Sequence, residues 1–214
     1  MRVVLLGPPG CGKGTQASRL CEKFGIAHIA TGDLFREHAA ANDELGQTAK
    51  KYMNAGELVP DSVVLEMVER RLEQSDASSG FLLDGFPRTV PQAEALQGIL
   101  AGSGVKLDAV IDIEVPDEEI VGRLGGRRVC LNCGEPYHVV SRPPKVDGKC
   151  DKCGHDLIHR SDDEPGTIRN RLGAYHKQTE PLIDFYGESG LVRRIDGGQT
   201  PEAVFGQVLK GLPG

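Results

Sequence analysis

The sequence lacks any long apolar run near its N-terminus. The longest one there extends only from Val3 to Leu6. A signal peptide needs an apolar region of about 7–15 residues, and a membrane-spanning helix needs about 20. We therefore expect a soluble, cytoplasmic protein with no membrane partner.

An excess of positive charge is also missing. The chain has 25 lysines and arginines against 31 aspartates and glutamates, which gives a formal net charge of −6. Nucleic acids and anionic membranes both repel an acidic protein, so the net charge argues against a general affinity for either. Basic residues can still be concentrated in one cleft, and arginine outnumbers lysine by 15 to 10. Arginine suits planar, bidentate recognition of phosphate.

Internal repeats and low-complexity segments are absent, which excludes a solenoid. Apolar strand-like segments instead alternate with helical patterns along the 214 residues. This alternation predicts an α/β fold with an open, parallel, five-stranded sheet and helices on both faces. The predicted strands are Val3 to Leu6, His28 to Ala30, Phe81 to Leu83, Val110 to Val115 and Leu191 to Ile195.

A glycine-rich loop follows the first predicted strand directly. It reads GPPGCGKGT from Gly7 to Thr15 and precedes a helical pattern from Gln16 to Phe24. In this context G-x-x-x-x-G-K predicts a P-loop of the NTPase type, whose backbone N–H groups and lysine bind phosphates. We expect glycines at 7, 10, 12 and 14 to supply backbone conformations that other residues avoid. Gly14 stands where the general motif has the Ser or Thr that ligates magnesium, and the hydroxyl comes one place later, at Thr15. The candidate ATP-binding residues of the loop are Gly10, Cys11, Gly12, Lys13, Gly14 and Thr15.

Two stretches interrupt the alternation and predict inserts on a core domain. Residues 30–60 are helical and too long for one crossover, whereas residues 127–160 have little helical period and contain four paired cysteines. We therefore assign 1–29, 61–126 and 161–214 to the core. Gly125 and Gly126, just before the second insert, are candidate hinge positions.

The paired cysteines have the spacing C-x2-C-x16-C-x2-C, at Cys130, Cys133, Cys150 and Cys153. In a reducing compartment such pairs indicate a metal site before they indicate disulfides. Four thiolates complete a tetrahedral zinc site with no open position, so the predicted role is structural. His138 and His155 lie nearby in sequence and are interpreted as surface residues.

A nucleotide-dependent zinc-ribbon module that binds nucleic acid or protein is the alternative from another class. From Arg127 to Glu164 the segment has seven basic and seven acidic residues, and Tyr137 is its only aromatic residue. Nucleic-acid binding needs a basic face and aromatic rings for stacking. The composition therefore disfavours this alternative.

Further motifs narrow the class of NTPase. They are T-G-D-L-F-R at 31–36, G-E-L-V-P-D at 56–61, D-G-F-P-R at 84–88, Gln92 and G-R-R at 126–128. Together they resemble adenylate kinase, in the long-lid bacterial form with a zinc-bearing lid, over residues 1 to about 205. The resemblance implies a monomer that transfers a phosphoryl group from ATP to AMP with Mg²⁺ and gives two ADP. A UMP/CMP kinase is the nearest alternative, but that type usually has a very short lid.

The resemblance also implies roles for individual residues, with residues 30–60 as the AMP-binding insert and 127–160 as the lid. Asp84 would orient water on magnesium, and Asp33 would either cap the helix that begins near Thr31 or lie near the magnesium ion. Further ATP contacts would come from Arg123, Arg127 and Gln199. The residues assigned to catalysis are Lys13, Arg88, Arg123, Arg160 and Arg171. The residues assigned to AMP are Thr31, Gly32, Arg36, Met53, Glu57, Leu58, Val59, Gly85, Arg88, Gln92, Arg160 and Arg171.

Overall fold

A five-stranded parallel sheet forms the centre of the molecule, as predicted. The computed structural model describes residues 1–213. The strands lie in the order β2-β3-β1-β4-β8, and each neighbouring pair is parallel. Their bounds are β1 (Arg2–Leu6), β2 (Ala27–Ala30), β3 (Phe81–Asp84), β4 (Ala109–Glu114) and β8 (Val192–Asp196).

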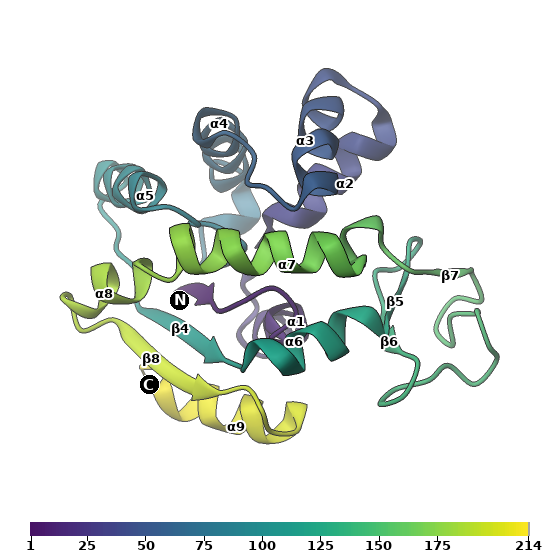
Figure 1. Ribbon diagram of the computed structural model, residues 1–214. Coiled ribbons are helices and arrows are strands. Elements are labelled where there is room, and N and C mark those ends of the chain that lie inside the picture. The colour runs from purple at the N-terminus through teal and green to yellow at the C-terminus, as the bar shows by residue number, and fades with distance from the viewer. Residues whose placement is uncertain (214) are drawn as a thin grey trace.

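Helices cover both faces of this sheet (Figure 1). They are α1 (Lys13–Phe24), α2 (Thr31–Ala41), α3 (Glu44–Ala55), α4 (Asp61–Leu72), α5 (Val90–Gly102), α6 (Asp117–Gly125), α7 (Pro165–Ala174), α8 (Leu182–Gly187) and α9 (Pro201–Gly211). Alternate strand residues point to opposite faces, so Val4 and Leu6 pack with α4, α5 and α8, whereas Val3 and Leu5 pack with α1, α6 and α9. Strands β1 and β3, in the middle of the sheet, are buried on both faces and read as near-continuous apolar runs, whereas the edge strand β8 carries Arg193 and Arg194.

The helical stretch after β2 contains α2 and α3, which stand together beside the sheet (Figure 1). Asp43 caps α3, because its side chain accepts a hydrogen bond from the backbone N–H of Gly46 at 2.7 Å. The two helices touch closely at Gly46, where a Cβ atom would lie 2.1 Å from the carbonyl oxygen of His38. Asp33 does not cap α2, which begins after Ala30 without a side-chain cap. The capping alternative for Asp33 is therefore wrong.

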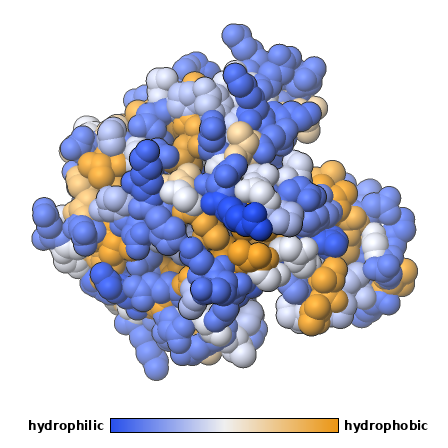
Figure 2. Space-filling view, in the orientation of Figure 1, coloured by the Kyte–Doolittle hydropathy of each residue, from blue (hydrophilic) through white to orange (hydrophobic). Residues whose placement is uncertain are grey.

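The cysteine-rich stretch forms a small antiparallel sheet in the order β6-β5-β7. Its strands are β5 (Arg127–Cys130), β6 (Pro136–His138) and β7 (Leu157–Ile158). This lobe lies beyond the C-terminus of α6 and the N-terminus of α7, at the right of Figure 1. Large exposed apolar side chains gather on it, and Figure 2 shows apolar surface there. They are Leu131, Val139, Val140 and Val146.

The cysteine-rich lobe meets the core around Gly126. A Cβ atom at Gly126 would lie 2.3 Å from Nε2 of His138. Nδ1 of His138 accepts hydrogen bonds from the backbone N–H groups of Val140 and Ser141, both at 3.1 Å. His138 is half-buried at this junction and keeps part of its surface exposed, and His155 is exposed as expected.

The segment after the cysteine-rich lobe returns the chain to the sheet. A turn at Ser161–Asp163 leads into α7, which continues through a π-helical turn at Tyr175–Thr179 towards α8. The start of α7 contacts the end of α3, where the side chain of Asn170 donates a hydrogen bond to the carbonyl oxygen of Ala55 at 3.0 Å. Another short helical turn, Ser75–Ala77, precedes β3. Within residues 1–213, no helix combines the length and the apolar character that crossing a bilayer requires.

Candidate active site

The P-loop lies at the carboxyl end of β1, the central strand. The strands that follow β1 in sequence lie on both sides of it, β2 and β3 on one side and β4 and β8 on the other. Crevices at such positions bind ligands in open α/β sheets. Gly7, Gly10 and Gly12 have φ angles of 131°, 82° and 105°, which only glycine adopts readily. Gly14 does not, because it lies within α1. The expectation that its backbone needs glycine is wrong.

Lys13 places a positive charge inside this loop. Its Nζ donates hydrogen bonds to the carbonyl oxygens of Gly7 at 2.6 Å and Pro8 at 2.8 Å. The N-terminus of α1 adds the positive end of the helix dipole at the same place. Cys11 is buried, and its burial raises the pKa of the thiol, so the loop cysteine is a neutral packing residue.

Asp84 ends β3, the strand next to β1, and therefore faces the P-loop. A Cβ atom on Gly14 would be 3.8 Å from Oδ2 of Asp84, and Nε2 of His28 lies 3.9 Å from the same oxygen. Burial alone would raise the pKa of Asp84, but His28 and Lys13 outweigh it and lower the pKa below its usual range. An ionised carboxylate beside a phosphate loop fits a hydrated magnesium ion.

Arginines from separate parts of the chain converge beyond the P-loop. Arg88 keeps an exposed surface, but partial desolvation, with the neighbouring cations Arg171 and Arg36, lowers its pKa to about 10. Desolvation lowers the pKa of the half-buried Arg160 to about 10 as well, helped by Arg36 and Arg127. Arg36 and Arg88 lie on adjoining segments, because Arg36 lies against Gly32, Arg88 lies against Gly85, and Thr31 bonds to the carbonyl oxygen of Gly85. Such a concentration of positive charge in a partly enclosed cleft is suited to a polyanion.

Two acidic residues next to Arg160 hold part of this cluster in place. The fully buried carboxylate of Asp163 accepts hydrogen bonds from Nε and Nη2 of Arg127 at 2.7 and 2.6 Å. It also accepts one from Nη1 of Arg171 at 3.0 Å. Asp162 lies 3.1 Å from the same Nη1. Burial opposes ionisation of Asp162, but Arg171 and Arg127 lower its pKa.

A second group of predicted ATP contacts meets at the turn after β8. Arg123 donates a hydrogen bond from Nη2 to the carbonyl oxygen of Gly197 at 2.9 Å. In the same turn Gln199 donates to Asp196 at 2.9 Å. The structure thus brings Arg123 on α6 beside the segment that contains Gln199, although the two are distant in sequence.

The predicted AMP residues meet at the start of α2 and the loop after β3. Thr31 is 2% exposed, and its hydroxyl donates a hydrogen bond to the carbonyl oxygen of Gly85 at 2.9 Å. Two glycines here leave room for arginine side chains. A Cβ atom at Gly85 would lie 3.0 Å from Arg88, and a Cβ atom at Gly32 would lie 3.1 Å from Arg36. The guanidinium of Arg36 also pairs with Asp33.

Other AMP candidates lie between α3 and α4. Met53 packs against the core cluster, and Val59 belongs to it. Leu58 is half-buried and Glu57 is exposed. These residues are positioned by the end of α3, which rests on α7 through Gly56 and Thr167. A Cβ atom at Gly56 would lie 2.8 Å from the carbonyl oxygen of Thr167.

The four paired cysteines form a compact sulfur cluster. Their Sγ atoms all lie within 4.8 Å of one another, with separations such as 3.4 Å between Cys130 and Cys153. A hydrogen bond from the backbone N–H of His155 is the main cause that lowers the pKa of Cys153 to about 6, which favours the thiolate that metals require. Four sulfurs from two tight turns fit a tetrahedral metal ion such as zinc.

Comparisons with known proteins agree with this geometry. The sequence profile of adenylate kinase matches residues 5–191. The chain is 53% identical to an adenylate kinase of Methanothrix thermoacetophila over 99% of this chain and 98% of that protein. It is 54% identical to those of Carboxydothermus hydrogenoformans, with 99% of each chain covered, and Streptomyces coelicolor, with 99% of this chain and 98% of that protein covered.

The chain belongs to the adenylate kinase family. It is therefore an enzyme, a kinase that transfers a phosphoryl group between nucleotides. This membership confirms the resemblance found in the motifs, and it favours neither the UMP/CMP alternative nor the interaction module.

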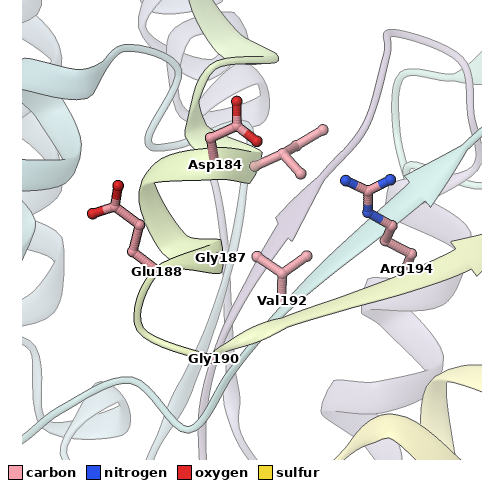
Figure 3. Close-up of a pocket in the computed structure, with 7 residues that line it drawn as sticks. Asp184, Gly187, Glu188, Gly190, Val192 and Arg194 are labelled. Atoms are coloured by element: carbon pink, nitrogen blue, oxygen red, sulfur yellow. The ribbon is translucent and has the colours of Figure 1, made fainter.

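A separate cavity of about 530 Å³ lies between α8 and the start of β8. Figure 3 shows Glu188 and Arg194 on opposite sides of it, with Val192 between them. None of the residues expected to bind nucleotide in an adenylate kinase lines it. It is accordingly not part of the candidate active site.

Sequence reasoning missed several residues that organise the site. Asp162 and Asp163 are interpretable from the sequence only as hinge or lid contacts outside the chemistry, and the available signal was an acidic pair two residues after Arg160. His28 beside Asp84 had no signal in the sequence, because only the pairing of β2 with β3 brings them together. Asp61 is assigned in the sequence only to the motif at 56–61, yet it accepts a hydrogen bond from Gln92.

Proposed function

We propose that the protein catalyses the reversible, magnesium-dependent transfer of the terminal phosphoryl group of ATP to AMP, which gives two ADP. The observation that carries this proposal is the gathering of arginines beside the P-loop: Arg36 and Arg88 lie at the start of α2 and the loop after β3, the strand next to β1, and Arg171 is held by the acidic pair that follows Arg160. ATP and AMP together bring several negative charges, and transfer between them needs charge neutralisation and in-line positioning more than covalent help. The acceptor oxygen of AMP is already anionic, so no general base is required.

The residues would divide the work between the two nucleotides. The P-loop from Gly10 to Thr15 would hold the phosphates of ATP, with Arg123, Arg127 and Gln199 beside them. A magnesium ion bound to ATP would neutralise phosphate charge, and Asp84 would orient its water ligands. Arg36 and Arg88 would hold the phosphate of AMP, and Gln92 would contact adenine. Arg160 and Arg171 would reach the phosphates of both nucleotides.

The two inserts would act as moving covers. Residues 30–60 would close on AMP and residues 127–160 on ATP, so that the full arginine set assembles only when water is excluded from the phosphoryl group. Zinc at Cys130, Cys133, Cys150 and Cys153 would keep the lid rigid. We also propose that the enzyme is a cytoplasmic monomer, which light scattering on the purified protein would test.

An assay of ADP formation tests the reaction. Purified protein with Mg²⁺, ATP and AMP should produce two ADP for each AMP consumed, and CMP or UMP in place of AMP should react much more slowly. Failure to form ADP from AMP would refute the proposal. Faster turnover with CMP or UMP than with AMP would favour the pyrimidine kinase instead.

A further inference from the structure

Asp61, the first residue of α4, holds the side chain that is expected to read the base. Its Oδ1 accepts a hydrogen bond from Nε2 of Gln92 at 2.7 Å, and its Oδ2 accepts one from the hydroxyl of Thr89 at 2.9 Å. The Gln92 amide oxygen Oε1 accepts a third bond, from the backbone N–H of Arg88 at 2.7 Å. Gln92 is 1% exposed, so water competes little for these bonds.

These partners allow only one orientation of the Gln92 amide. An amide oxygen can face an N–H donor, and an amide NH₂ can face a carboxylate. If the amide were flipped, NH₂ would face the N–H of Arg88 and the oxygen would face the carboxylate of Asp61. Both contacts would then be repulsive, and two buried hydrogen bonds would be lost. Asp61 and the Arg88 backbone therefore fix which end of the amide is donor and which is acceptor.

The orientation of an amide decides which purine it can read. The edge of adenine offers a ring nitrogen acceptor beside a 6-amino donor, which matches an amide N–H beside an amide oxygen. Hypoxanthine and guanine have a 6-oxo group instead, so their oxygen would face the amide oxygen of Gln92. A site that leaves such a polar pair unsatisfied rejects the wrong ligand strongly.

We propose that Asp61 is a positioning residue for purine selectivity: it locks the amide of Gln92 so that the acceptor site takes a 6-aminopurine monophosphate and rejects a 6-oxopurine monophosphate. The inference rests on the proposed function, because it requires Gln92 to contact the base of AMP. Asp61 itself acts through Gln92. The cytosine edge has the same donor and acceptor order as adenine, so this lock does not concern CMP.

The test compares AMP with IMP, which differs from AMP only in the 6-oxo group and the proton on N1. The ratio of kcat/KM for AMP to kcat/KM for IMP is measured for the wild type, Asp61→Ala and Asp61→Asn. For Asp61→Ala we expect the ratio to fall about tenfold, the effect of one buried hydrogen bond, with KM for ATP unchanged. Asp61→Asn should retain the ratio within about threefold, because an asparagine oxygen can still accept from Nε2.

Two controls separate this role from a merely structural one. Asp117→Ala removes a carboxylate in the first turn of another core helix, α6, and should leave the ratio unchanged. In a Gln92→Ala background, Asp61→Ala should cause no further loss of selectivity, because the residue through which it acts is gone. A structural role would give the same loss in both backgrounds.

A spectroscopic measurement needs no variant. In the ¹⁵N–¹H spectrum of the wild-type protein, the side-chain NH₂ of Gln92 should exchange with solvent much more slowly than that of Gln97, which is exposed on the same helix. Equally fast exchange would overturn the proposal, as would an AMP to IMP ratio in Asp61→Ala within twofold of the wild type. If the wild type made no ADP from AMP, the proposed function would fail instead, so the two failures are distinguishable.

Discussion

Arg127 forms two parallel hydrogen bonds with the buried carboxylate of Asp163, from Nε at 2.7 Å and from Nη2 at 2.6 Å. The two residues are 36 positions apart and flank the cysteine-rich lobe, so this pair joins the segments through which the chain enters and leaves the lobe. Bidentate pairs of this kind are geometrically specific. The pair therefore fixes the direction of one arginine in the cluster and, through the third bond from Arg171, that of another.

Replacing Asp163 should damage both stability and catalysis. Asp163→Ala leaves Arg127 and Arg171 without their buried partner, and removing one member of a buried pair costs about 3–5 kcal/mol. We expect the free energy of unfolding, measured with urea, to fall by that order, and kcat to fall with it. The exposed pair of Arg19 and Glu202 supplies the control, since Glu202→Ala should leave the denaturation midpoint unchanged. Equal midpoints for Asp163→Ala and the wild type would contradict the role given to this carboxylate.

Arg88→Ala should lower kcat by about 10³-fold or more, because an arginine that stabilises charge in phosphoryl transfer contributes that much. Steady-state assays with ATP and AMP measure the effect. Arg70, which is 76% exposed on α4 and pairs with Glu66, is the matched control. Turnover of Arg88→Ala within a few-fold of the wild type would show that the phosphate assignment is wrong.

Removal of the metal expected at the four cysteines of the cysteine-rich lobe should lower the melting temperature without removing a catalytic group. Structural zinc contributes about 10–16 kcal/mol of apparent free energy in small zinc modules, and this lobe has few buried apolar residues besides its cysteines. Calorimetry with and without a chelator, combined with metal analysis, measures the effect. Cys150→Ser should reproduce the chelated state, whereas Cys21→Ser, outside the cluster, should not. An unchanged melting temperature after complete loss of metal would refute a structural role.

His176 should make the protein more stable at acidic than at alkaline pH, relative to a variant without it. Its ring nitrogens contact Glu180 at 2.8 Å and Asp117 at 3.0 Å, and these carboxylates raise its pKa above the usual 6.5. A raised pKa in the folded state stabilises the protein fully below pH of about 6.5 and ceases to do so as the pH rises through the folded-state value. The melting temperature of the wild type should therefore exceed that of His176→Gln at pH about 5.5, and the difference should vanish near pH 9. A difference that grows with pH would contradict this assignment.

The core of the fold was predictable because its strands are buried on both faces. Runs such as Val3 to Leu6 are then apolar throughout and stand out in the sequence. The sequence also marks two helix starts, because Pro60 and Pro116 stand directly before Asp61 and Asp117, where α4 and α6 begin. The order of the strands was not predictable, because it depends on which strands pair across long crossovers.

The small antiparallel sheet of the cysteine-rich lobe was not predicted, for a different reason. Its strands have only two to four residues, too few for a periodic pattern, and pairing partners such as Val129 and Ile158 are distant in sequence.

In the candidate site too, some residues could be predicted from the sequence and others could not. Arginines could be recognised from motifs, whereas the carboxylates of Asp61 and Asp163 gain their roles only from tertiary neighbours. Gly14 illustrates the converse, since a motif position suggested backbone freedom that its helical surroundings do not require.

The backbone contact at Gly46 has a mechanical consequence. Helices that approach until a single methyl group no longer fits between them cannot slide or roll against each other without a collision. We therefore expect α2 and α3 to move as one rigid unit. Any rotation of this unit would take place near residues 30 and 60, where it joins the core. Gly46→Ala would introduce a methyl group between the two helices and force them apart.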